Sequence, residues 1–235
     1  MTDLFLRGIS IDWNTEELNN SWISRIEALR NTEQLTFHRS ITFFTGENGS
    51  GKSTLLESIA IALGLNPEGG TRNYRFSTFD DHSSLHRAIR LHRGALRPGW
   101  SYFLRAESFY SMTAASVRDY DGRDLHAMSH GESFLEFIRD NSTPGLYLMD
   151  EPEAALSPQN QLTLLIQITE LARKGAQLII ATHSPILTGA PDAELLSFDG
   201  STIRPVNYEE TGCYRVMKLF LNDRQHMLRQ MLEDH

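Results

Sequence analysis

The sequence predicts an α/β protein built around a mostly parallel β-sheet, and three observations support this fold class. Leu146–Met149 and Leu178–Ala181 are short, wholly apolar runs, which is typical of parallel strands buried on both faces. The stretch between them carries the end signals of a helix, with Ser157 and Pro158 at its start and Gly175 just after its end. Strand–helix–strand alternation of this kind predicts an α/β core.

Further elements are expected in the N-terminal part of the chain. Leu4–Ile11 alternates like a strand, and Leu35–Thr45 contains strand material that ends in an apolar run. Lys52–Leu63 places its apolar residues on one face, which predicts a helix that ends at Gly64. Residues 1–65 and 144–235 form the expected core lobe of one domain spanning residues 1–235.

Residues 66–143 are expected to form an inserted lobe. Leu85–Arg93 and Ser101–Arg105 resemble antiparallel strands, and helical stretches are expected near Thr113–Arg118 and His130–Asp140. One last helix, about Tyr214–Leu232, is expected to close the chain.

Composition limits the class of protein. The 235 residues are 40% hydrophobic and 22% charged, which is ordinary for a globular protein. No apolar run approaches the ~18 residues that span a bilayer, and Met1–Leu4 lacks the basic and apolar regions of a signal peptide. The single cysteine, Cys213, cannot form an internal disulfide, so a cytoplasmic location is expected.

Charge is unevenly distributed along the chain. The net charge of −8 argues against a protein that coats nucleic acid with its whole surface. The segment from Arg72 to Arg105 nevertheless has a net charge of +5, so the remainder carries −13. Its arginines are Arg72, Arg75, Arg87, Arg90, Arg93, Arg97 and Arg105. They form either a solvated strand face or a local surface that binds anions.

A glycine-rich segment between the apolar strand and the amphipathic helix fits the pattern G-x-x-x-x-G-K-[ST]. Glycines allow backbone N–H groups to turn inward around phosphate oxygens, and the following helix directs its positive end at them. The lysine reaches the β- and γ-phosphates, and the serine hydroxyl can ligate Mg²⁺. The expected ATP-binding residues are Gly46, Glu47, Asn48, Gly49, Ser50, Gly51, Lys52, Ser53 and Thr54.

Two carboxylates follow the apolar strand at 146–149. At a strand end beside the phosphate-binding loop, Asp150 can hold Mg²⁺ together with Ser53. Glu151 can polarise the attacking water as a general base. The expected cofactors are therefore ATP and Mg²⁺, and the expected catalytic residues include Glu151 and Lys52.

These residues and two later groups resemble a known series. The chain contains, in order, stretches that resemble the Walker B, D-loop and switch-histidine motifs of ABC ATPases. They are Asp150–Glu153, Ala155–Ser157 and Thr182–Ser184. The resemblance implies that His183 contacts the γ-phosphate and senses hydrolysis. Its position after an apolar strand also places it at the carboxyl edge of the sheet, where ligands gather in such folds.

Met128–Glu132 resembles a degenerate ABC signature, in which Ser129 and Gly131 are kept. Ser129 and Glu132 also form S-x-x-E, a capping box at the start of a helix. The two interpretations are compatible, because a helix start with a free serine hydroxyl is a good phosphate ligand.

The family resemblance covers most of the chain, and more narrowly points to the compact stand-alone ATPases described as AAA-family or ABC-like. It implies the P-loop NTPase fold of the ABC ATPase type, with a mostly parallel core sheet, an antiparallel N-terminal sheet and an inserted helical signature lobe. It also implies a head-to-tail homodimer on ATP binding, in which Ser129 and Gly131 complete the site of the partner.

Two departures from the family pattern concern the nucleotide site. No glutamine marks the Q-loop, where Arg105 or Glu107 could replace it. No aromatic residue is certain to stack on adenine, although Trp13, Trp22 and Phe37 precede the phosphate-binding loop.

What hydrolysis drives stays open between two classes. The first is a soluble ATPase that acts on nucleic acid or a protein partner, which the arginine-rich segment favours. The second is the ATP-binding subunit of a membrane transporter, which would act with a separate permease. A P-loop kinase would share the glycine-rich loop but would not need the signature and histidine motifs.

Overall fold

A computed structural model describes residues 4–67, 83–105, 130–140 and 143–233. The main sheet has six strands in the order β5-β6-β7-β3-β8-β9. Five of them run parallel and β9 is antiparallel to β8, so the mostly parallel core sheet is confirmed. The strands are β3 (Ile41–Thr45), β5 (Ser101–Arg105), β6 (Leu146–Asp150), β7 (Gln177–Ala181), β8 (Glu194–Ser197) and β9 (Arg204–Pro205).

A second, antiparallel sheet has the order β2-β1-β4, which confirms the antiparallel N-terminal sheet. Its strands are β1 (Leu6–Ile11), β2 (Gln34–Thr36) and β4 (Ile89–Arg93). Short helices link β1 to β2, namely α1 (Glu16–Asn19), η1 (Trp22–Arg25) and α2 (Glu27–Arg30).

One expectation about strand pairing is wrong. Residues 85–93 and 101–105 do not pair with each other as antiparallel strands. Leu85–Ala88 is the short helix α4, β4 pairs with β1, and β5 pairs in parallel with β6. The two strands lie in different sheets, β4 at the edge of the antiparallel sheet and β5 at the edge of the main sheet. The division of the chain into a core lobe and an inserted lobe stays a prediction.

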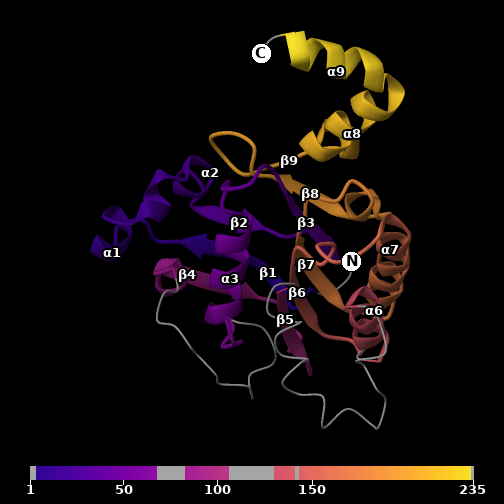
Figure 1. Ribbon diagram of the computed structural model, residues 1–235. Helices are drawn as coiled ribbons and strands as arrows, with labels where there is room; N and C mark the ends of the chain where they lie inside the picture. Colours follow the sequence, from indigo (N-terminus) through magenta and orange to yellow (C-terminus); the bar gives the residue numbers. More distant parts are fainter. Residues whose placement is uncertain (1–3, 68–82, 106–129, 141–142, 234–235) are drawn as a thin grey trace.

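Helices cover both faces of the main sheet (Figure 1). Alternate residues of each strand point to opposite faces. Phe44 and Leu148 pack with α3 (Lys52–Ala62), whereas Phe43 and Tyr147 pack with α6 and α7. Helix α6 spans His130–Asp140 and α7 spans Pro158–Arg173, as the sequence predicted. Helix α3 and helix α6 therefore lie on opposite faces of the sheet.

The ends of α7 follow the predicted capping chemistry. The Ser157 hydroxyl accepts a hydrogen bond from the backbone N–H of Asn160 at 3.3 Å, and Pro158 occupies the first turn. Gly175 has a φ of 96°, the left-handed conformation that lets the chain turn from the helix into β7. This turn fixes where β7 begins.

A buried glutamine joins the two sheets. Gln177, at the start of β7, is 1% exposed. Its amide Nε2 donates to the carbonyl oxygen of Leu6 at 2.7 Å, and its Oε1 accepts from the Leu6 N–H at 2.9 Å. Because an unpaired buried backbone group is costly, this side chain satisfies an edge that strand pairing leaves open.

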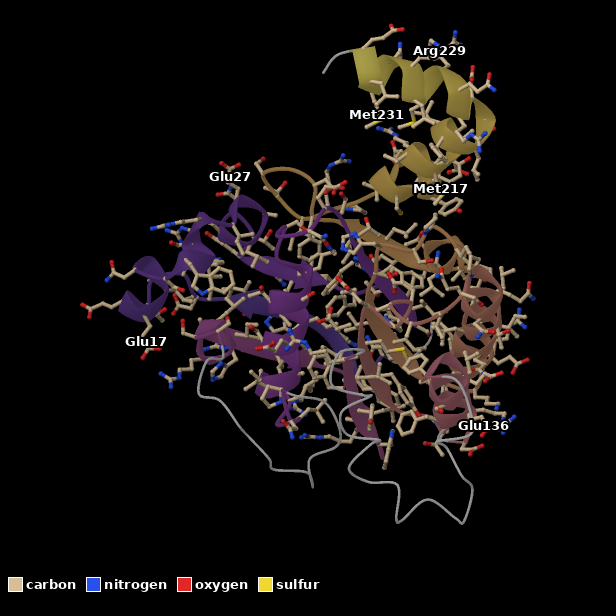
Figure 2. All side chains as sticks on the ribbon, in the orientation of Figure 1. Glu17, Glu27, Glu136, Met217, Arg229 and Met231 are labelled. Carbon is tan, nitrogen blue, oxygen red and sulfur yellow. The ribbon has the colours of Figure 1, made fainter. Side chains whose placement is uncertain are left out.

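The C-terminal residues form two helices rather than the single one expected. Helix α8 (Gly212–Asn222) and helix α9 (Arg224–Glu233) are separated by Asp223, whose φ of −147° and ψ of 70° are not helical. Neither helix contains a buried residue, and both extend from the body of the protein, so Met217 and Met231 face solvent (Figures 1 and 2). The remaining connections include η3 (Leu187–Gly189) and η4 (Tyr208–Glu210).

The expected helix near residues 113–118 lies outside the described residues. Within the part of the chain that the structure describes, no helix combines the length and apolar character needed to cross a membrane.

We predict that Gln177→Leu destabilises the protein by roughly 2–4 kcal/mol, because it leaves the N–H and C=O of Leu6 buried without partners. Urea unfolding followed by circular dichroism would measure this. Gln34→Leu is the matched control, since Gln34 is exposed on β2 and its substitution should change stability by less than about 0.5 kcal/mol. Equal effects of the two substitutions would contradict the proposed link between the sheets.

Candidate nucleotide-binding and hydrolysis site

The phosphate-binding loop connects the buried strand β3 to helix α3. Gly46 and Gly51 have φ values of 140° and 98°, in the region that favours glycine. A Cβ at Gly46 would lie 2.9 Å from Asp199 Oδ1, and one at Gly51 would lie 2.8 Å from Leu29 Cδ1. Glycine is therefore required at both positions for conformation and for space.

Lys52 is held inside this loop. Its side chain is buried at 4% exposure, and Nζ donates to the carbonyl oxygens of Gly46 at 2.7 Å and Glu47 at 2.9 Å. Burial lowers the pKa of Lys52, and this effect outweighs the nearby carboxylates of Glu151 and Asp199, which raise it. Among the described residues, the buried ammonium bonds to neutral carbonyl groups, which fits the arrival of an anionic phosphate.

Ser50 gives a second indication of the same ligand. Its Oγ is shielded from solvent and finds no hydrogen-bond partner within the described structure. A buried hydroxyl without a partner carries a desolvation cost, which a phosphate oxygen would remove.

The two expected Mg²⁺ ligands meet directly. The Ser53 hydroxyl donates a hydrogen bond to Oδ1 of Asp150 at 2.8 Å, from the start of α3 to the end of β6. Asp150 is 5% exposed, and burial raises its pKa to about 6, although the Ser53 hydrogen bond and Arg105 lower it. Two hard oxygen ligands at a triphosphate site fit Mg²⁺, which takes its other ligands from phosphate and water.

Arg105 lies at this same corner. In the parallel pairing of β5 with β6, Arg105 is in register with Asp150. Its Nη1 lies 3.0 Å from Glu57 Oε2, and its Nε lies 3.7 Å from Asp150 Oδ2. Of the two candidates for the Q-loop position, Arg105 thus lies beside Asp150, an expected Mg²⁺ ligand, while Glu107 lies outside the described residues. The side chain of Arg105 faces Asp150 and Glu57, so it does not belong to a surface formed by the arginine-rich segment.

Glu151 and His183 come together from neighbouring strand ends. The Glu151 N–H donates to the carbonyl oxygen of Ala181 at 2.9 Å, and Glu151 has a φ of 48°, which is strained for a residue with a side chain. Its Oε1 lies 3.6 Å from Nε2 of His183. This separation is longer than a hydrogen bond, and His183 Nε2 is shielded from solvent with no hydrogen-bond partner within the described structure.

The signature residues are only partly described. Ser129 lies outside the described residues, and Gly131 lies in the first turn of α6. A Cβ at Gly131 would lie 2.9 Å from the carbonyl oxygen of Ala155 and 3.1 Å from Cδ2 of Leu156. Gly131 therefore allows α6 to approach the D-loop of its own chain closely.

The three aromatic residues considered for adenine differ in exposure. Trp13 and Phe37 are buried in the core, and Trp13 Nε1 donates to the carbonyl oxygen of Thr32 at 3.1 Å. Trp22 is 58% exposed. Of these three side chains, only Trp22 is exposed enough to stack on a base.

Sequence reasoning missed two carboxylates at the site. Oδ1 of Asp199, which follows β8, accepts a hydrogen bond from the Glu47 N–H at 2.7 Å. Oε1 of Glu153 accepts hydrogen bonds from the Thr182 hydroxyl and the His183 N–H at 2.6 and 2.7 Å. The carboxyl-edge position of Asp199 could have indicated it, and Glu153 belongs to the Walker B-like motif without an assigned role.

A cavity of about 240 Å³ lies beside this loop. Its walls include Gly46, Glu47 and His183 from the site, and Cys213 and Met217 from α8. The C-terminal helices thus begin next to the phosphate-binding loop.

The geometry is that expected of a P-loop ATPase of the ABC type. Residues 23–112 match a family model described as "AAA domain", and residues 105–188 match one described as "AAA domain, putative AbiEii toxin, Type IV TA system". The predicted ABC-type P-loop ATPase is confirmed, and with it ATP hydrolysis as the activity.

Individual proteins agree with this class. The chain is 24% identical over 208 residues to the phosphate import ATP-binding protein PstB of Oceanobacillus iheyensis, covering 74% of each. It is 29% identical over 168 residues to the hemin import ATP-binding protein HmuV of Pseudomonas aeruginosa, covering 59% of this chain and 64% of that protein. Its fold is similar to the SMC head domain from Thermotoga maritima, with a TM-score of 0.51 and 14% identity. The match covers 87% of this chain and 100% of that domain.

We predict that Asp150→Asn stabilises the protein without nucleotide, and that the gain depends on pH. The folded-state pKa of about 6 lies above the ordinary value of 3.8, so the contribution of this group to stability is present below pH 4 and is lost as pH rises through 6. The difference corresponds to roughly 2–3 kcal/mol. Unfolding midpoints of both proteins between pH 5 and pH 8 measure it.

The stabilisation by Asp150→Asn should be largest above pH 7 and shrink toward pH 5. Asp192→Asn is the control, since Asp192 is exposed and its left-handed φ of 58° also suits Asn. A gain that does not change with pH would contradict the assignment of a buried, proton-binding carboxylate.

Proposed function

We propose that this ATPase hydrolyses Mg-ATP with the residues gathered at the carboxyl edge of the main sheet. Lys52 neutralises the β- and γ-phosphates, and Ser53 and Asp150 hold Mg²⁺. Glu151 accepts a proton from the attacking water as general base, and His183 donates a hydrogen bond toward the γ-phosphate. The Ser53–Asp150 hydrogen bond of 2.8 Å and the 3.6 Å approach of His183 to Glu151 support these roles.

The proposal includes ATP-gated dimerisation. One observation carries it: the P-loop helix α3 and the signature helix α6 pack on opposite faces of one sheet. The start of α6 also rests against Ala155 and Leu156 of its own chain. A signature placed there is directed away from the phosphates of the same chain. Two copies arranged head to tail would let Ser129 and Gly131 of each complete the other's site.

A nucleic-acid partner is supported by exposed arginines on and after the edge strand β4. Arg90, Arg93 and Arg97 are exposed, whereas Arg105 belongs to the site and Arg87 pairs with Glu17 at 3.1 Å. Positive side chains on one edge suit a phosphate backbone.

We place the ATPase in the cytoplasm, consistent with a chain that has one cysteine.

The second candidate is a subunit that drives a membrane permease. The similarity to PstB and HmuV, both named as import ATP-binding proteins, favours it. The two candidates share the ATPase site and differ in what the dimer contacts.

We predict that Glu151→Gln forms a stable dimer with Mg-ATP, whereas the wild type with ADP stays monomeric. Glutamine keeps the size of the side chain but cannot accept the proton, so the ATP-bound state persists. Light scattering coupled to size-exclusion chromatography measures the mass of each species.

Two further substitutions control this experiment. Adding Lys52→Ala should abolish both ATP binding and the dimer. Adding Ser129→Arg should abolish the dimer while each monomer still binds ATP in calorimetry. A Glu151→Gln protein that stays monomeric at saturating Mg-ATP and high protein concentration would refute the head-to-tail model.

We also predict that the protein binds DNA through Arg90, Arg93 and Arg97. Affinity for a labelled DNA duplex should fall steeply with salt, by a slope of about 0.9 for each neutralised phosphate. Changing all three residues to Glu should lower the affinity at low salt by more than about tenfold. Fluorescence anisotropy at several salt concentrations measures both effects.

The matched control changes Arg173, Arg204 and Arg229 to Glu, which alters net charge equally at exposed positions elsewhere. If both triple variants lose affinity equally, the binding is non-specific attraction to net charge. If the wild type binds no DNA at low salt, the DNA-binding role of these arginines is wrong, and a protein partner or a permease is left.

A further inference from the structure

The carboxylate of Glu153 connects the two turns that carry Glu151 and His183. Glu153 lies in the turn after β6, two residues beyond Glu151. Its Oε1 accepts from the Thr182 hydroxyl at 2.6 Å and from the His183 N–H at 2.7 Å, in the turn after β7. Both donors are next to each other in the chain, so one oxygen fixes the backbone from which the His183 side chain projects.

Both of these hydrogen bonds are made by a single oxygen of Glu153. Its Oε2 is shielded from solvent and finds no hydrogen-bond partner within the described structure. A buried carboxylate oxygen without a partner is costly, so stability alone gives a weak reason for a glutamate here. A role of Oε1 in positioning His183 would explain why a glutamate with this cost is present.

The turn after β7 is also held by Gln161 of α7, through Ser184. The Ser184 hydroxyl donates to Oε1 of Gln161 at 2.7 Å and accepts from the N–H groups of Ile186 and Leu187, both at 3.1 Å. The Thr182 hydroxyl also accepts from the Ser184 N–H at 3.0 Å. Gln161 thus ties the turn to α7, and Glu153 ties it to the turn of Glu151.

The turns after β6 and β7 are joined by hydrogen bonds of the backbone and of the Glu153 side chain. The Glu151 N–H bonds to the Ala181 carbonyl oxygen at 2.9 Å, and Glu153 bonds to the next two residues after Ala181. These contacts hold together the two turns from which Glu151 and His183 project, and the side chains approach to 3.6 Å between Oε1 of Glu151 and Nε2 of His183. A shift of either turn would change that separation directly.

We propose that Glu153 is a positioning residue for hydrolysis, which holds His183 at the correct distance from Glu151 and the γ-phosphate. It acts through two hydrogen bonds to the His183 turn and does not touch the nucleotide. The inference rests on the proposed roles of Glu151 and His183. It requires the hydrogen bonds of Oε1 and does not require the negative charge.

The test compares Glu153→Ala with Glu153→Gln, each in the wild type and in a His183→Ala background. Glutamine keeps an oxygen that can accept both hydrogen bonds, whereas alanine removes it. Glu170→Ala is the matched control, since Glu170 is exposed on α7. Hydrolysis is followed in single turnover with radiolabelled ATP, ATP affinity by calorimetry, and folding by thermal melting.

We expect Glu153→Ala to lower the hydrolysis rate by about tenfold to a hundredfold, because small misplacements of a reacting group have effects of that size. ATP affinity should stay within about twofold, since the phosphate-binding loop is untouched. Glu153→Gln should restore most of the rate. In the His183→Ala background, Glu153→Ala should have almost no further effect, because both changes remove the same interaction.

The outcomes separate this inference from the proposed function. If Glu153→Ala slows hydrolysis equally in both backgrounds, or if Glu153→Gln is as slow as Glu153→Ala, the positioning role is wrong while the proposed function stands. If His183→Ala itself leaves hydrolysis unchanged, the proposed role of His183 fails, and the inference fails with it.

Discussion

The parallel register of β6, β7 and β3 is the constraint on which the site depends. Asp150 is paired with Ala181, and Ala181 is paired with Phe44. The three strands therefore end at one level, and the turns that follow them carry the acidic pair, His183 and the phosphate-binding loop. Because parallel strands need long crossover connections, this edge collects residues that are about a hundred positions apart in sequence.

Burial makes the charges at this edge dependent on what they bind. The pKa of Lys52 is lowered and that of Asp150 is raised to about 6, in both cases mainly because the groups are removed from water. Lys52 contacts carbonyl oxygens, whereas Asp150 contacts the Ser53 hydroxyl and lies 3.7 Å from Nε of Arg105, a guanidinium that also pairs with Glu57. A triphosphate with its metal would supply opposite charges to both.

The main sheet also separates two parts of the machinery. Helix α3 packs against one face and α6 against the other, because alternate strand residues are directed to opposite sides. The same alternation that fills both halves of the core places α6, which begins at the signature-like residues, on the face opposite α3. A requirement for a second copy of the chain would thus follow from the layering of the fold.

Local signals in the sequence determined the strands at 146–149 and 178–181, the caps of α7, the glycine-rich loop and the residues at its ends. Each depends on a few neighbouring residues. Only the tertiary structure decided which strands β4 and β5 join, that Arg105 faces Asp150, that Asp199 holds the loop, and that Glu153 holds His183. These contacts join residues between 30 and 152 positions apart in the chain. No short pattern encodes them, because they depend on how the sheet brings distant turns to one edge.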